Sequence, residues 1–507
     1  MARICVPVCV SHADELLNAV KRAAEVADLI ELRFDCLEAD QLDAALRECA
    51  GFSKGASHPF IITFRPAEQG GKRAISAAER IHFWLHKIPK PATHDLHDVE
   101  LALLANDEMR EQLPSQQVIC SHHDFNGVPP DLNTIYESMS STPDVILKLA
   151  VLAHDVTDCI PILKLLERAR SEGRELIAIA MGQAGVLTRI LGPSRGSYLT
   201  YGSLDEDSRT TPGQLTAREL RQVYRIDQID RQTQVTGLIG NPVAHSLSPH
   251  IHNAAFAQAE MNAVFIPFEV NDLDGFIRRM VRKTSCEIDW NLRGLSVTAP
   301  HKTAVIKHVD WIDPAAKQIG AVNTIVIAGD QLRGYNTDAA AFVASLKGRF
   351  GSLANARCAV IGSGGAARAV IYGLKNEGAA VTVFARERHK AEALSDLHEG
   401  DVRELPNADF EGFYIVINAT PLGTLGKLAA ETPATMKQLR GVRLAYDLVY
   451  NPFATQFMHE ARAAGCEAVG GLEMLIAQAV EQFSLWMERE PDIGTMRVAA
   501  EKALRAE

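Results

Sequence analysis

The sequence contains a lysine, Lys148, in the middle of an apolar run, DVILKLAVL, that extends from Asp144 to Leu152. Burying an unpaired charge costs several kcal/mol, a large part of the stability of a domain. A lysine held among apolar neighbours has a depressed pKa, and its neutral amine can attack a ketone to form a Schiff base. The alternative is a strand end whose lysine extends its ammonium group into water. The run by itself slightly favours this alternative, so the choice depends on the residues around the lysine.

Charged and polar side chains also occupy one phase of several other β-rich runs. Successive side chains of a strand point to opposite faces, so residues two apart share a face. In the run of Lys148 the bulky phase suits a layer of helices, which leaves Ile146, Lys148 and Ala150 pointing inward. The same alternation in other runs gives the inward residues Glu31, Arg33, Asp35, Thr63, Arg65, Asp98, Glu100, Ser121 and His123. Because a barrel interior is normally filled by branched apolar residues, these charges indicate an active site.

These residue types indicate a Schiff-base reaction on an anionic substrate. A histidine near the lysine can move protons near neutral pH, while the iminium acts as the electron sink in place of a metal. Arg33, Arg65 and Arg189 suit a negatively charged substrate such as a carboxylate. Glu31 and Arg33 alone could form a structural ion pair, and His122 is interpreted as a polar rim residue. The residues predict a Schiff-base lyase, with aldolase and dehydratase both open.

Regular alternation of strands and helices must position these residues. The first 225 residues contain eight β-rich runs, with helix-like segments such as ADELLNAVKRAAEVA between most of them. The runs begin at Ile4, Leu29, Phe60, Asp95, Gln117, Asp144, Leu176 and Ser197. Eight strand-helix units in a region of this length predict a (β/α)8 barrel, whose active site lies at the C-terminal ends of its strands.

Seven motifs in this region resemble one enzyme family. In the order of type I 3-dehydroquinate dehydratase, the region carries ELRFD, TFRPAEQGG, DVEL, SHHDF, KLAV, MGQAGVLTR and TPGQ. The resemblance implies that Lys148 forms an imine with the C3 ketone of 3-dehydroquinate. His123 directly precedes Asp-Phe, as the family's base does, and would remove the C2 proton and help water leave from C1. Glu100 would orient this histidine.

The resemblance also assigns residues to the substrate. It assigns the hydroxyl groups to Glu31, Arg33 and Arg65, and the carboxylate to Arg189 and Gln214. Thr210 stands where bacterial members usually have serine, and because the hydroxyl is kept we expect little loss of binding. The first region is therefore expected to bind 3-dehydroquinate among the inward residues of its strands.

A second set of chemistry-bearing residues begins at Gly362, in the string GSGGAAR. The string lies between an apolar strand and a helix, where a pyrophosphate meets backbone N–H groups and a helix N-terminus. Ala367 stands at the third glycine position of the dinucleotide pattern, so the string alone is a weak signal. About 20 residues further on, where NAD sites carry an acidic residue, the chain has Arg386, Arg388 and Lys390. Cations at this place favour NADP over NAD.

The motifs around this string resemble shikimate dehydrogenase from Val235 to about Pro491. In the order of that family, the chain carries GNPVAHSLSPHIHN, LSVTAPHK, GAVNT, YNTD, GSGGAAR, NATPLG, YDLVYNP and GLEMLIAQA. The resemblance implies that the nicotinamide delivers hydride to the C3 ketone of 3-dehydroshikimate. Lys302 would supply the proton and Asp338 would orient the lysine, although such a pair is more often a surface salt bridge.

Further residues of this region receive roles from the same resemblance. The substrate residues are Ser246 and Ser248 at the carboxylate, and Thr298, Asn323, Tyr450 and Gln478 at the hydroxyls. The NADP residues are Gly362, Gly364, Gly365, Ala366, Arg386, Lys390, Thr420 and Gly471. The chain departs from many members at Ser296, Ala339 and Ala385, where they have asparagine, glycine and asparagine. The change at Ser296 leaves the choice between shikimate and quinate open.

Changes in composition divide the chain into segments. The polar stretch RIDQIDRQTQ separates the first region from the second. The predicted fold class is α/β, with an N-terminal (β/α)8 barrel followed by a two-domain dehydrogenase that has a Rossmann-type NADP-binding domain. The predicted segments are the barrel 1–225, a linker 226–234, a substrate-binding and catalytic domain 235–340 and an NADP-binding domain 341–470. Helices in 471–507 are expected to pack back on the substrate-binding domain.

The bulk composition argues against several other classes of protein. The 52 basic and 63 acidic residues give a net charge of −11, which builds no broad basic surface for nucleic acid or an anionic membrane. Nine cysteines without CxxC pairs or His/Cys clusters at zinc spacing predict reduced thiols and no metal site. No apolar run approaches the roughly 20 residues of a membrane span, and the start lacks the pattern of a signal or transit peptide. A cytoplasmic location is expected.

The two resemblances imply consecutive reactions of the shikimate pathway on small-molecule substrates, with the product of the first region as substrate of the second. A regulator that kept the folds and senses metabolites is a second hypothesis. The presence of Lys148, His123, Lys302 and Asp338 together argues against it. A dehydratase fused to a catabolic quinate dehydrogenase is a third hypothesis. The oligomeric state stays open.

Overall fold

The computed structural model describes residues 2–506 except for 53–57, 89–94, 212, 388, 390, 391, 393, 395, 396, 398–400, 406 and 407. Of the residues predicted to bind NADP, Lys390 lies outside the described residues, as does the neighbouring Arg388. The chain divides into two compact units, one formed by 1–233 with 268–290 and the other by 234–267 with 291–507.

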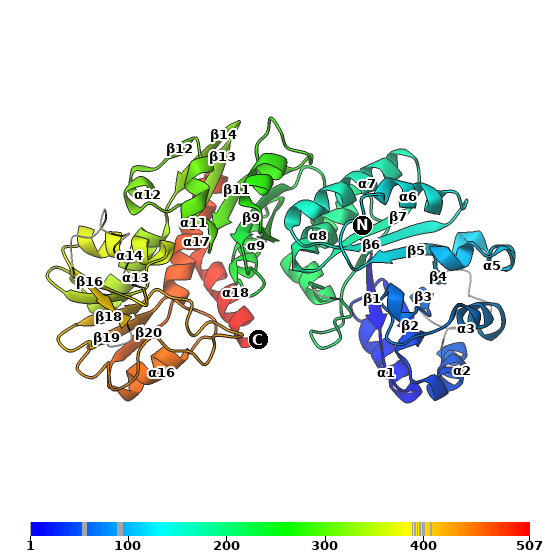
Figure 1. The fold of residues 1–507 in the computed structure, drawn as a ribbon, viewed down its shortest axis with the longest axis horizontal. Coiled ribbons are helices and arrows are strands. Elements are labelled where there is room, and N and C mark those ends of the chain that lie inside the picture. Colours follow the sequence, from blue (N-terminus) through cyan, green and yellow to red (C-terminus); the bar gives the residue numbers. More distant parts are fainter. Residues whose placement is uncertain are drawn as a thin grey trace. The chain divides into compact units, whose positions relative to one another are not determined.

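The first unit contains a parallel sheet that nearly closes on itself. Within the described ranges the strand order is β7-β6-β5-β4-β3-β2-β1-β8, and an isolated parallel bridge from Leu176 to Ser197 connects the two ends. The strands are β1 (Ile4–Val8), β2 (Leu29–Arg33), β3 (Phe60–Thr63), β4 (Leu96–Glu100), β5 (Val118–Asp124), β6 (Ile146–Leu152), β7 (Leu176–Met181) and β8 (Thr200–Tyr201). The helices are α1 (Ala13–Ala24), α2 (Leu42–Phe52), α3 (Ala77–His82), α4 (Leu101–Leu104), α5 (Asp107–Gln112), α6 (Leu132–Ser140), α7 (Cys159–Ser171), α8 (Val186–Arg195) and α10 (Leu273–Phe276). Helices such as α1, α2, α6 and α7 lie outside the strands, as expected for a (β/α)8 barrel (Figure 1).

The inward faces of the barrel strands form two layers. A buried cluster, called the apolar layer below, consists of Cys5, Leu29, Ile61, Leu96, Ile119, Ile146, Ile177, Ile179, Leu199 and Tyr201. Three charged residues each lie two positions after a residue of this layer in the same strand: Glu31 after Leu29, Asp98 after Leu96 and Lys148 after Ile146. Since residues two apart share a face, these buried charges lie on the same inward side as the apolar layer. The charges therefore lie nearer the C-terminal ends of the strands.

Two cysteines of the barrel form a disulfide bond. The sulfur atoms of Cys9 and Cys36 are 2.01 Å apart and the Cα atoms 5.4 Å apart, so the prediction of reduced thiols is wrong for this pair. Cys9 follows β1 and Cys36 ends a short 3₁₀ turn after β2. The two strands pair side by side, with Val8 opposite Leu32, which brings the ends of the strands together. The two cysteines are close because their strands pair. They are 27 residues apart in the sequence, and no motif indicates that they form a bond.

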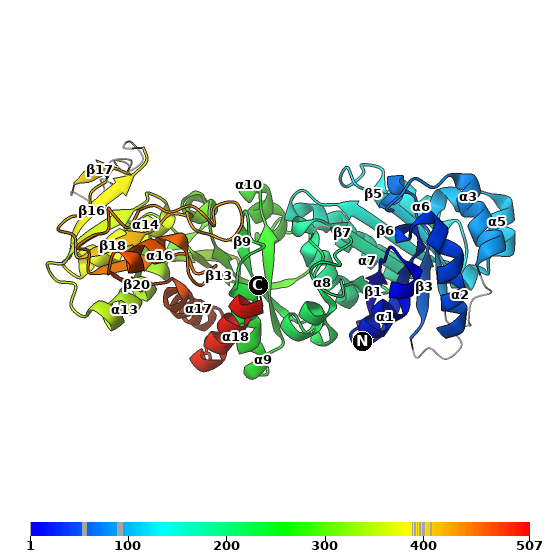
Figure 2. The ribbon, with the colours of Figure 1, turned by 90° about the horizontal axis from the view of Figure 1, so that it is seen from below.

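The second unit begins with a mixed sheet in the order β10-β9-β11-β13-β14-β12. Its strands are β9 (Gln234–Gly240), β10 (Ala263–Glu269), β11 (Asn291–Val297), β12 (Trp311–Ile312), β13 (Thr324–Ala328) and β14 (Gln331–Tyr335). Its helices are α9 (Ser248–Gln258), α11 (His301–Ala304), α12 (Pro314–Ile319), α17 (Leu472–Met487) and α18 (Ile493–Ala506). Phe256 of α9, Phe483 of α17 and Met496 of α18 share one hydrophobic core, so the C-terminal helices pack beside α9 (Figure 2).

A parallel sheet forms the rest of the second unit, in the order β17-β16-β15-β18-β19-β20. Its elements are α13 (Asp338–Phe350), β15 (Arg357–Ile361), α14 (Gly365–Asn376), β16 (Ala380–Ala385), β17 (Val402–Glu404), β18 (Ile415–Asn418), β19 (Leu444–Asp447), α16 (Gln456–Ala463) and β20 (Glu467–Val469). Numbered from β15, the order is 3-2-1-4-5-6, that of a doubly wound dinucleotide-binding fold. Val360 and Ile361 of β15 belong to different hydrophobic clusters, so both faces of the sheet are covered. The predicted α/β fold class is confirmed.

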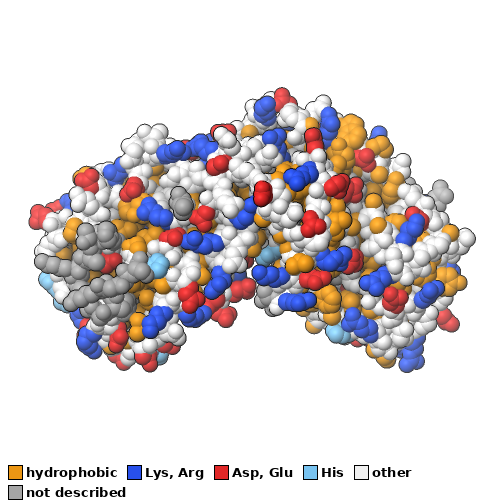
Figure 3. All heavy atoms as spheres, turned by 180° about the vertical axis from the view of Figure 1, so that it is seen from behind, with side chains coloured by type: hydrophobic (Ala, Val, Ile, Leu, Met, Phe, Trp, Pro, Cys, Tyr) orange, Lys and Arg blue, Asp and Glu red, His pale blue; other side chains and the backbone are white. Residues whose placement is uncertain are grey.

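Acidic and basic side chains are interspersed over the face seen in Figure 3. None of the helices formed by the described residues is both long and apolar enough to cross a membrane. The same residues contain no group of three or more His, Cys, Asp or Glu side chains placed to hold a metal ion.

Candidate active sites

A pocket opens among the C-terminal ends of the barrel strands. The predicted dehydratase residues that line it are Glu31, Arg33, Arg65, His123, Lys148, Arg189, Thr210 and Gln214. The lining residues outside the prediction include Gln69, Gly70, Phe125, Tyr201 and Thr211. Residues from widely separated parts of the barrel sequence thus meet in one cavity, and of the predicted set only Glu100 does not line it.

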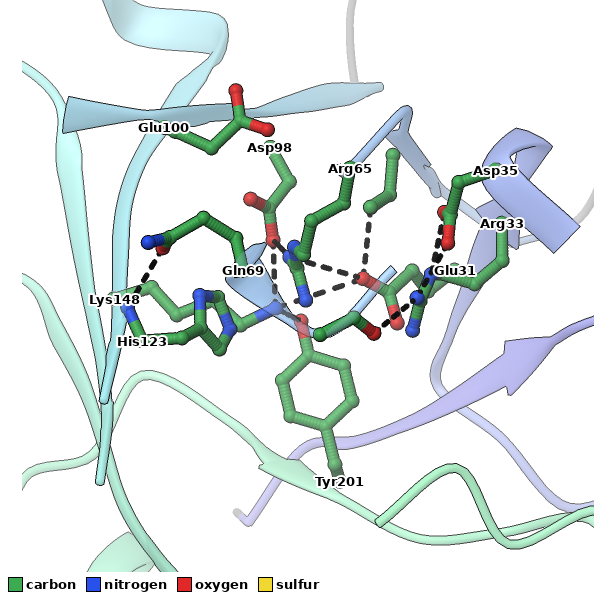
Figure 4. A network of polar contacts seen from close by, with 12 residues as sticks. Glu31, Arg33, Asp35, Arg65, Gln69, Asp98, Glu100, His123, Lys148 and Tyr201 are labelled. Carbon is green, nitrogen blue, oxygen red and sulfur yellow. Dashed lines mark hydrogen bonds and ion pairs between the residues drawn. The ribbon is translucent and has the colours of Figure 1, made fainter. Parts of the chain in front are cut away.

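Lys148 lies at the centre of a polar network in this pocket (Figure 4). Its Nζ donates hydrogen bonds to Asp98 Oδ2 at 2.6 Å and to the Tyr201 hydroxyl at 2.9 Å, and it lies 3.6 Å from Glu31 Oε1. The lysine is 4% exposed, so its burial is confirmed. Charged residues of the predicted inward phase surround its nitrogen, in place of the apolar neighbours from which a depressed pKa was expected. Asp98 comes from β4, and a strand two places away in the barrel cannot be paired with β6 from the sequence alone.

Two arginines hold the carboxylates of this network. Arg65 donates to Asp98 at 2.6 Å and lies 3.9 Å from Glu31, while Arg33 forms a bidentate pair with Asp35 at 2.8 and 2.7 Å. Burial raises the pKa of Asp98, but the positive charges of Arg65 and Lys148 outweigh it and hold this pKa well below its usual range. Asp98 is therefore a carboxylate at neutral pH. The ion pair considered for Arg33 forms with Asp35 instead of Glu31.

His123 presents a neutral imidazole to the pocket. Burial, assisted by the positive charges of Arg65 and Lys148, holds the pKa of His123 well below its usual value. Its Nδ1 has no hydrogen-bond partner among the described residues, and its backbone N–H donates to Gln69 Oε1 at 3.0 Å. A neutral imidazole with an unoccupied nitrogen can accept a proton.

Glu100 does not contact this histidine. Its Oε1 accepts a hydrogen bond from Arg80 at 3.2 Å, and burial raises its pKa. The carboxylate points away from His123 in Figure 4. The prediction that Glu100 orients the histidine is therefore wrong for this structure, because the glutamate at the last position of β4 turns to Arg80 of α3.

The guanidinium of Arg189 lines the same pocket and has no carboxylate partner among the described residues. Arg189 is 2% exposed and, within this part of the chain, donates to the backbone oxygen of Tyr201 at 3.3 Å and to Thr211 Oγ1 at 3.1 Å. Burial lowers its pKa to about 10, and its Nε has no partner in the described part of the chain. Gln214 accepts from the backbone N–H and the hydroxyl of Thr210, which orients its amide. The arrangement suits a ligand carboxylate, which would compensate the buried charge.

Three residues of the network were not assigned a role from the sequence. Asp98 shares the inward phase of β4, so its position could be found by strand alternation, although its pairing with Lys148 could not. Tyr201 ends β8, a strand of two residues with too short a pattern to analyse. Gln69 lies in a short 3₁₀ turn after β3, where alternation no longer applies.

The second unit contains a lysine-aspartate pair at two helix starts. Lys302 Nζ donates to Asp338 Oδ2 at 2.6 Å, and Asn323 donates to Asp338 Oδ1 at 2.8 Å. Asn323 also donates to Thr337 Oγ1 at 2.9 Å, which fixes the amide. Both oxygens of the aspartate are thus occupied, while the lysine can still donate its remaining hydrogens. Lys302, Asp338 and Asn323, three of the predicted residues, are brought together.

The other predicted substrate residues belong to the same unit. Ser248 is the first residue of α9 and its backbone N–H donates to Ser246 Oγ at 3.2 Å. Thr298 follows β11, Tyr450 follows β19, and Gln478 lies on α17. Gln482 lies one turn after Gln478 on α17, and no role was assigned to it from the sequence. Its buried amide donates to Ser296 Oγ at 3.1 Å and to Thr324 Oγ1 at 3.0 Å.

The glycine turn after β15 forms a cradle at a helix N-terminus. Gly362 has φ +126°, and a Cβ there would lie 2.9 Å from the backbone oxygen of Ala419. A Cβ at Gly364 would meet nothing within 4 Å, so the space over the start of α14 is open. Exposed Arg386 directly follows β16. Backbone N–H groups at a helix start and a cation after the second strand fit a dinucleotide that carries an extra phosphate.

The remaining predicted cofactor residues frame the same sheet edge. Gly365 begins α14, and a Cβ there would lie 3.0 Å from Lys302 Cβ, so the glycine turn adjoins the lysine-aspartate pair. Ala366 follows it in the first turn of the helix. Thr420 donates to Asn418 Oδ1 at 2.6 Å just after β18, and Gly471 precedes α17.

Models of known families match nearly the whole chain. Type I 3-dehydroquinase matches residues 4–231 and the shikimate dehydrogenase substrate binding domain matches 238–325. A putative NAD(P)-binding family matches 350–439, and the shikimate 5'-dehydrogenase C-terminal domain matches 471–501. The first three matches follow one another along the sequence in the order of the barrel, the mixed sheet and the parallel sheet, and the last covers α17 and the first part of α18.

Individual proteins give the same picture. The bifunctional 3-dehydroquinate dehydratase/shikimate dehydrogenase, chloroplastic, of Arabidopsis thaliana is 31% identical over 507 residues, 95% of this chain and 81% of that protein. The shikimate biosynthesis protein AroDE of Chlamydia pneumoniae is 29% identical over 489 residues, 95% of each chain. A crystal structure of a shikimate dehydrogenase in complex with NADP+ is 34% identical, covers 54% of this chain and 97% of its own, and has a TM-score of 0.50. The chain resembles fused proteins over nearly its whole length and a separate dehydrogenase over its second half.

Proposed function

Because the chain belongs to the family of bifunctional 3-dehydroquinate dehydratase/shikimate dehydrogenases, we propose which of its residues catalyse the two reactions. The enzyme dehydrates 3-dehydroquinate to 3-dehydroshikimate and reduces this product to shikimate with NADPH as cofactor. We assign dehydration to 1–225 and reduction to the region after the linker 226–234. Within that region, 235–340 with the C-terminal helices binds the substrate, and 341–470 binds NADP.

In the dehydration, Lys148 forms an imine with the C3 ketone. The protonated imine withdraws electrons from C2 and so makes the C2 proton acidic. Asp98 at 2.6 Å and Glu31 at 3.6 Å support this assignment, because two carboxylates stabilise a positive charge on the nitrogen. Burial of the lysine limits hydrolysis of the imine before the dehydration is complete. One water molecule must then reach the product imine, and its oxygen becomes the C3 ketone as the C–N bond breaks and the Lys148 amine is released.

His123 removes the C2 proton and returns it to the hydroxyl that leaves from C1. The low pKa of the buried imidazole keeps it in the proton-accepting form, and its Nδ1 has no competing partner among the described side chains. Arg189 pairs with the substrate carboxylate while the Gln214 amide donates to it. This pairing fixes the substrate between the arginine and the lysine.

In the reduction, Lys302 donates the proton to the carbonyl oxygen. Asp338, held by Asn323, orients the ammonium and balances its charge. Bound NADPH supplies the hydride. The residues proposed to hold NADPH are the glycine turn at Gly362, Thr420 and Arg386. Ser246, Ser248, Thr298, Tyr450 and Gln478 are proposed to bind the substrate of this half.

The observation that carries the dehydration is one pocket that contains Lys148, His123 and Arg189. Reduction with sodium borohydride in the presence of 3-dehydroquinate should attach the ligand covalently to Lys148, as peptide mass spectrometry would detect. Borohydride without the ligand serves as the control. Attachment at another residue, or an unmodified protein, would refute the assignment.

We also propose that the enzyme works in the cytoplasm on small molecules, without nucleic acid or membrane partners. Among the described residues seven cysteines are free thiols, six of them buried, which is typical of a reducing compartment. The Cys9–Cys36 disulfide is the contrary observation. Cell fractionation should recover the protein with cytoplasmic markers, and recovery from an oxidising compartment would contradict the proposal.

A further inference from the structure

The Tyr201 hydroxyl lies next to the nitrogen that reacts, yet it has no role in the chemistry described above. It is 2.9 Å from Lys148 Nζ, and the same nitrogen lies 4.4 Å from the centre of the tyrosine ring. The side chain is 6% exposed and lines the dehydratase pocket, with the hydroxyl directed at the lysine in Figure 4. Its backbone is fixed, because it ends β8 opposite Cys5 of β1 and its carbonyl accepts from Arg189.

The hydrogen bonds of this hydroxyl leave its own proton available. Lys148 is the donor of the hydrogen bond, so the tyrosine oxygen is the acceptor. Among the residues that the structure describes, the hydroxyl donates to none. Its hydrogen can therefore be given to a ligand in the pocket that both residues line.

The surroundings of Lys148 create a need for such a group. The Lys148 nitrogen pairs with Asp98 at 2.6 Å and lies 3.6 Å from Glu31, contacts that an ammonium ion makes, whereas attack on a ketone requires the free amine. Asp98 is a poor acceptor for the departing proton, because Arg65 and Lys148 stabilise its charge and lower its pKa. His123 is assigned to the C2 proton. Burial raises the pKa of Tyr201 well above its usual value, so a free tyrosinate is unfavourable and the proton must be passed on as it is received.

We propose that Tyr201 is a catalytic residue of the dehydration, a proton relay between the Lys148 nitrogen and the C3 oxygen of the substrate. The proposal rests on the imine at Lys148 proposed above. As an N–H bond of the ammonium breaks, the proton moves to the tyrosine oxygen, and the tyrosine proton moves to the ketone oxygen. The freed lone pair forms the C–N bond while the carbonyl π electrons become the new O–H bond.

The same relay completes the imine. The nitrogen of the resulting carbinolamine is positively charged, and a second N–H proton passes through Tyr201 to the C3 hydroxyl, which leaves as water. The nitrogen lone pair then forms the C=N bond, and the tyrosine is unchanged. The nitrogen bears a positive charge in the ammonium, the protonated carbinolamine and the iminium. The two nearby carboxylates can therefore pair with a cation before and after the relay.

The test replaces Tyr201→Phe, which removes one oxygen and keeps the ring. In single-turnover experiments, the imine trapped by borohydride should form about 100-fold more slowly, a loss typical of proton-transfer catalysis. The final amount of adduct at Lys148 should match the wild type. The isotope effect of 3-dehydroquinate deuterated at C2 should fall towards one, because imine formation becomes slower than proton removal. Imine formation at the wild-type rate would overturn the proposal.

Two comparisons separate this role from a structural one. Tyr198→Phe in the same segment is the matched control, because its ring stacks on Arg3 and does not line the pocket. It should leave imine formation unchanged. Placing 3-fluorotyrosine at 201 keeps the packing but changes the acidity of the hydroxyl, so it should change the rate of imine formation. An unchanged rate there would also overturn the relay, whereas a wild-type enzyme without adduct at Lys148 would refute the proposed function itself.

Discussion

The two lysines that we propose as catalytic residues occupy different kinds of surroundings. The side chain of Lys148 is 5% exposed and faces two carboxylates and a tyrosine hydroxyl, whereas that of Lys302 is 18% exposed and faces one aspartate. Enclosure of a lysine that forms a covalent bond limits hydrolysis of the imine before the reaction on the bound substrate is complete. A lysine that only donates a proton must recover it from solvent in each cycle, so partial exposure is useful. The comparison teaches that enclosure distinguishes the nucleophile from the acid.

Lys148→Ala should produce the largest effect and test this distinction directly. Removing the nucleophile should lower the rate of dehydration by about 10⁴-fold or more. The reduction of supplied 3-dehydroshikimate should stay at the wild-type rate in the same protein, which serves as the folding control. Both rates can be followed by enone absorbance and by NADPH loss. Substantial dehydration by the variant would show that Lys148 is not the nucleophile.

Lys302→Gln should have a smaller effect, because it removes a proton donor and not a covalent centre. The kcat of reduction should fall by about 10³-fold, within the range of general acid catalysis, and KM should change less. Dehydration in the same variant should be unaffected. If Lys302→Gln raised KM and left kcat intact, the lysine would be a binding residue.

Arg189→Leu should weaken substrate binding in the barrel. Losing a buried charge pair should lower kcat/KM of dehydration by about 100-fold, mostly through KM. The isotope effect at C2 should persist, because the residues that move protons remain. An unchanged KM would place the substrate carboxylate elsewhere in the pocket.

The smallest of the expected effects is a difference between the two units in the free energy of unfolding that acidification removes. His97 and His123 in the barrel and His252 in the second unit are buried, and burial lowers the pKa of His97 to about 4 and that of His252 to about 3. Since these values lie below the ordinary one, the unfolded chain binds protons more readily, and stability falls as the pH drops below about 6.5. From pH 7 to 5.5 each such histidine should cost about 1.4 kcal/mol.

The barrel should therefore be the more acid-sensitive unit. In the second unit, burial raises the pKa of Asp447 to about 6, so its protonation offsets part of the loss from the one histidine there. In the barrel, the raised pKa of Glu100 gives an offset of the same sign, but against the loss from two histidines. Calorimetric unfolding at both pH values would resolve the two units. Equal losses in both units would contradict the assignment of His97 and His123 as neutral groups.

Much of the barrel site could be predicted from the sequence because strand alternation is a local property. Glu31 and Lys148 each follow the apolar residue of their own strand by two positions, and this needs no knowledge of the fold. The pairing of Asp98 with Lys148 joins residues 50 apart on strands that are not neighbours, so it depends on closure of the barrel. The prediction that Glu100 orients His123 failed for the same reason. Arg80, which pairs with Glu100, lies on a helix, where the alternation of strand side chains gives no information.

Prediction of the site in the second half depended more on family motifs than on physical patterns. The spacing of Lys302 and Asp338 carries no periodicity, and they meet because the turn after β11 and the start of α13 lie together. Strand β16 and the glycine turn could be recognised locally, since apolar residues, glycines and a following cation are contiguous. The disulfide between Cys9 and Cys36 had no local signal at all.

The apolar layer of the barrel has a consequence for how the enzyme can evolve. The buried charges nearer the C-terminal ends of the strands contribute little net stability. The stability of the barrel beyond what folding requires therefore comes from apolar residues such as Ile146 and Leu96. Conservative losses there, for example Ile146→Val, leave the chemistry intact but reduce the number of further substitutions that the fold can tolerate. Directed evolution of new substrate preference should therefore proceed further when the apolar layer is kept or reinforced, because the mutational tolerance of the pocket residues depends on it.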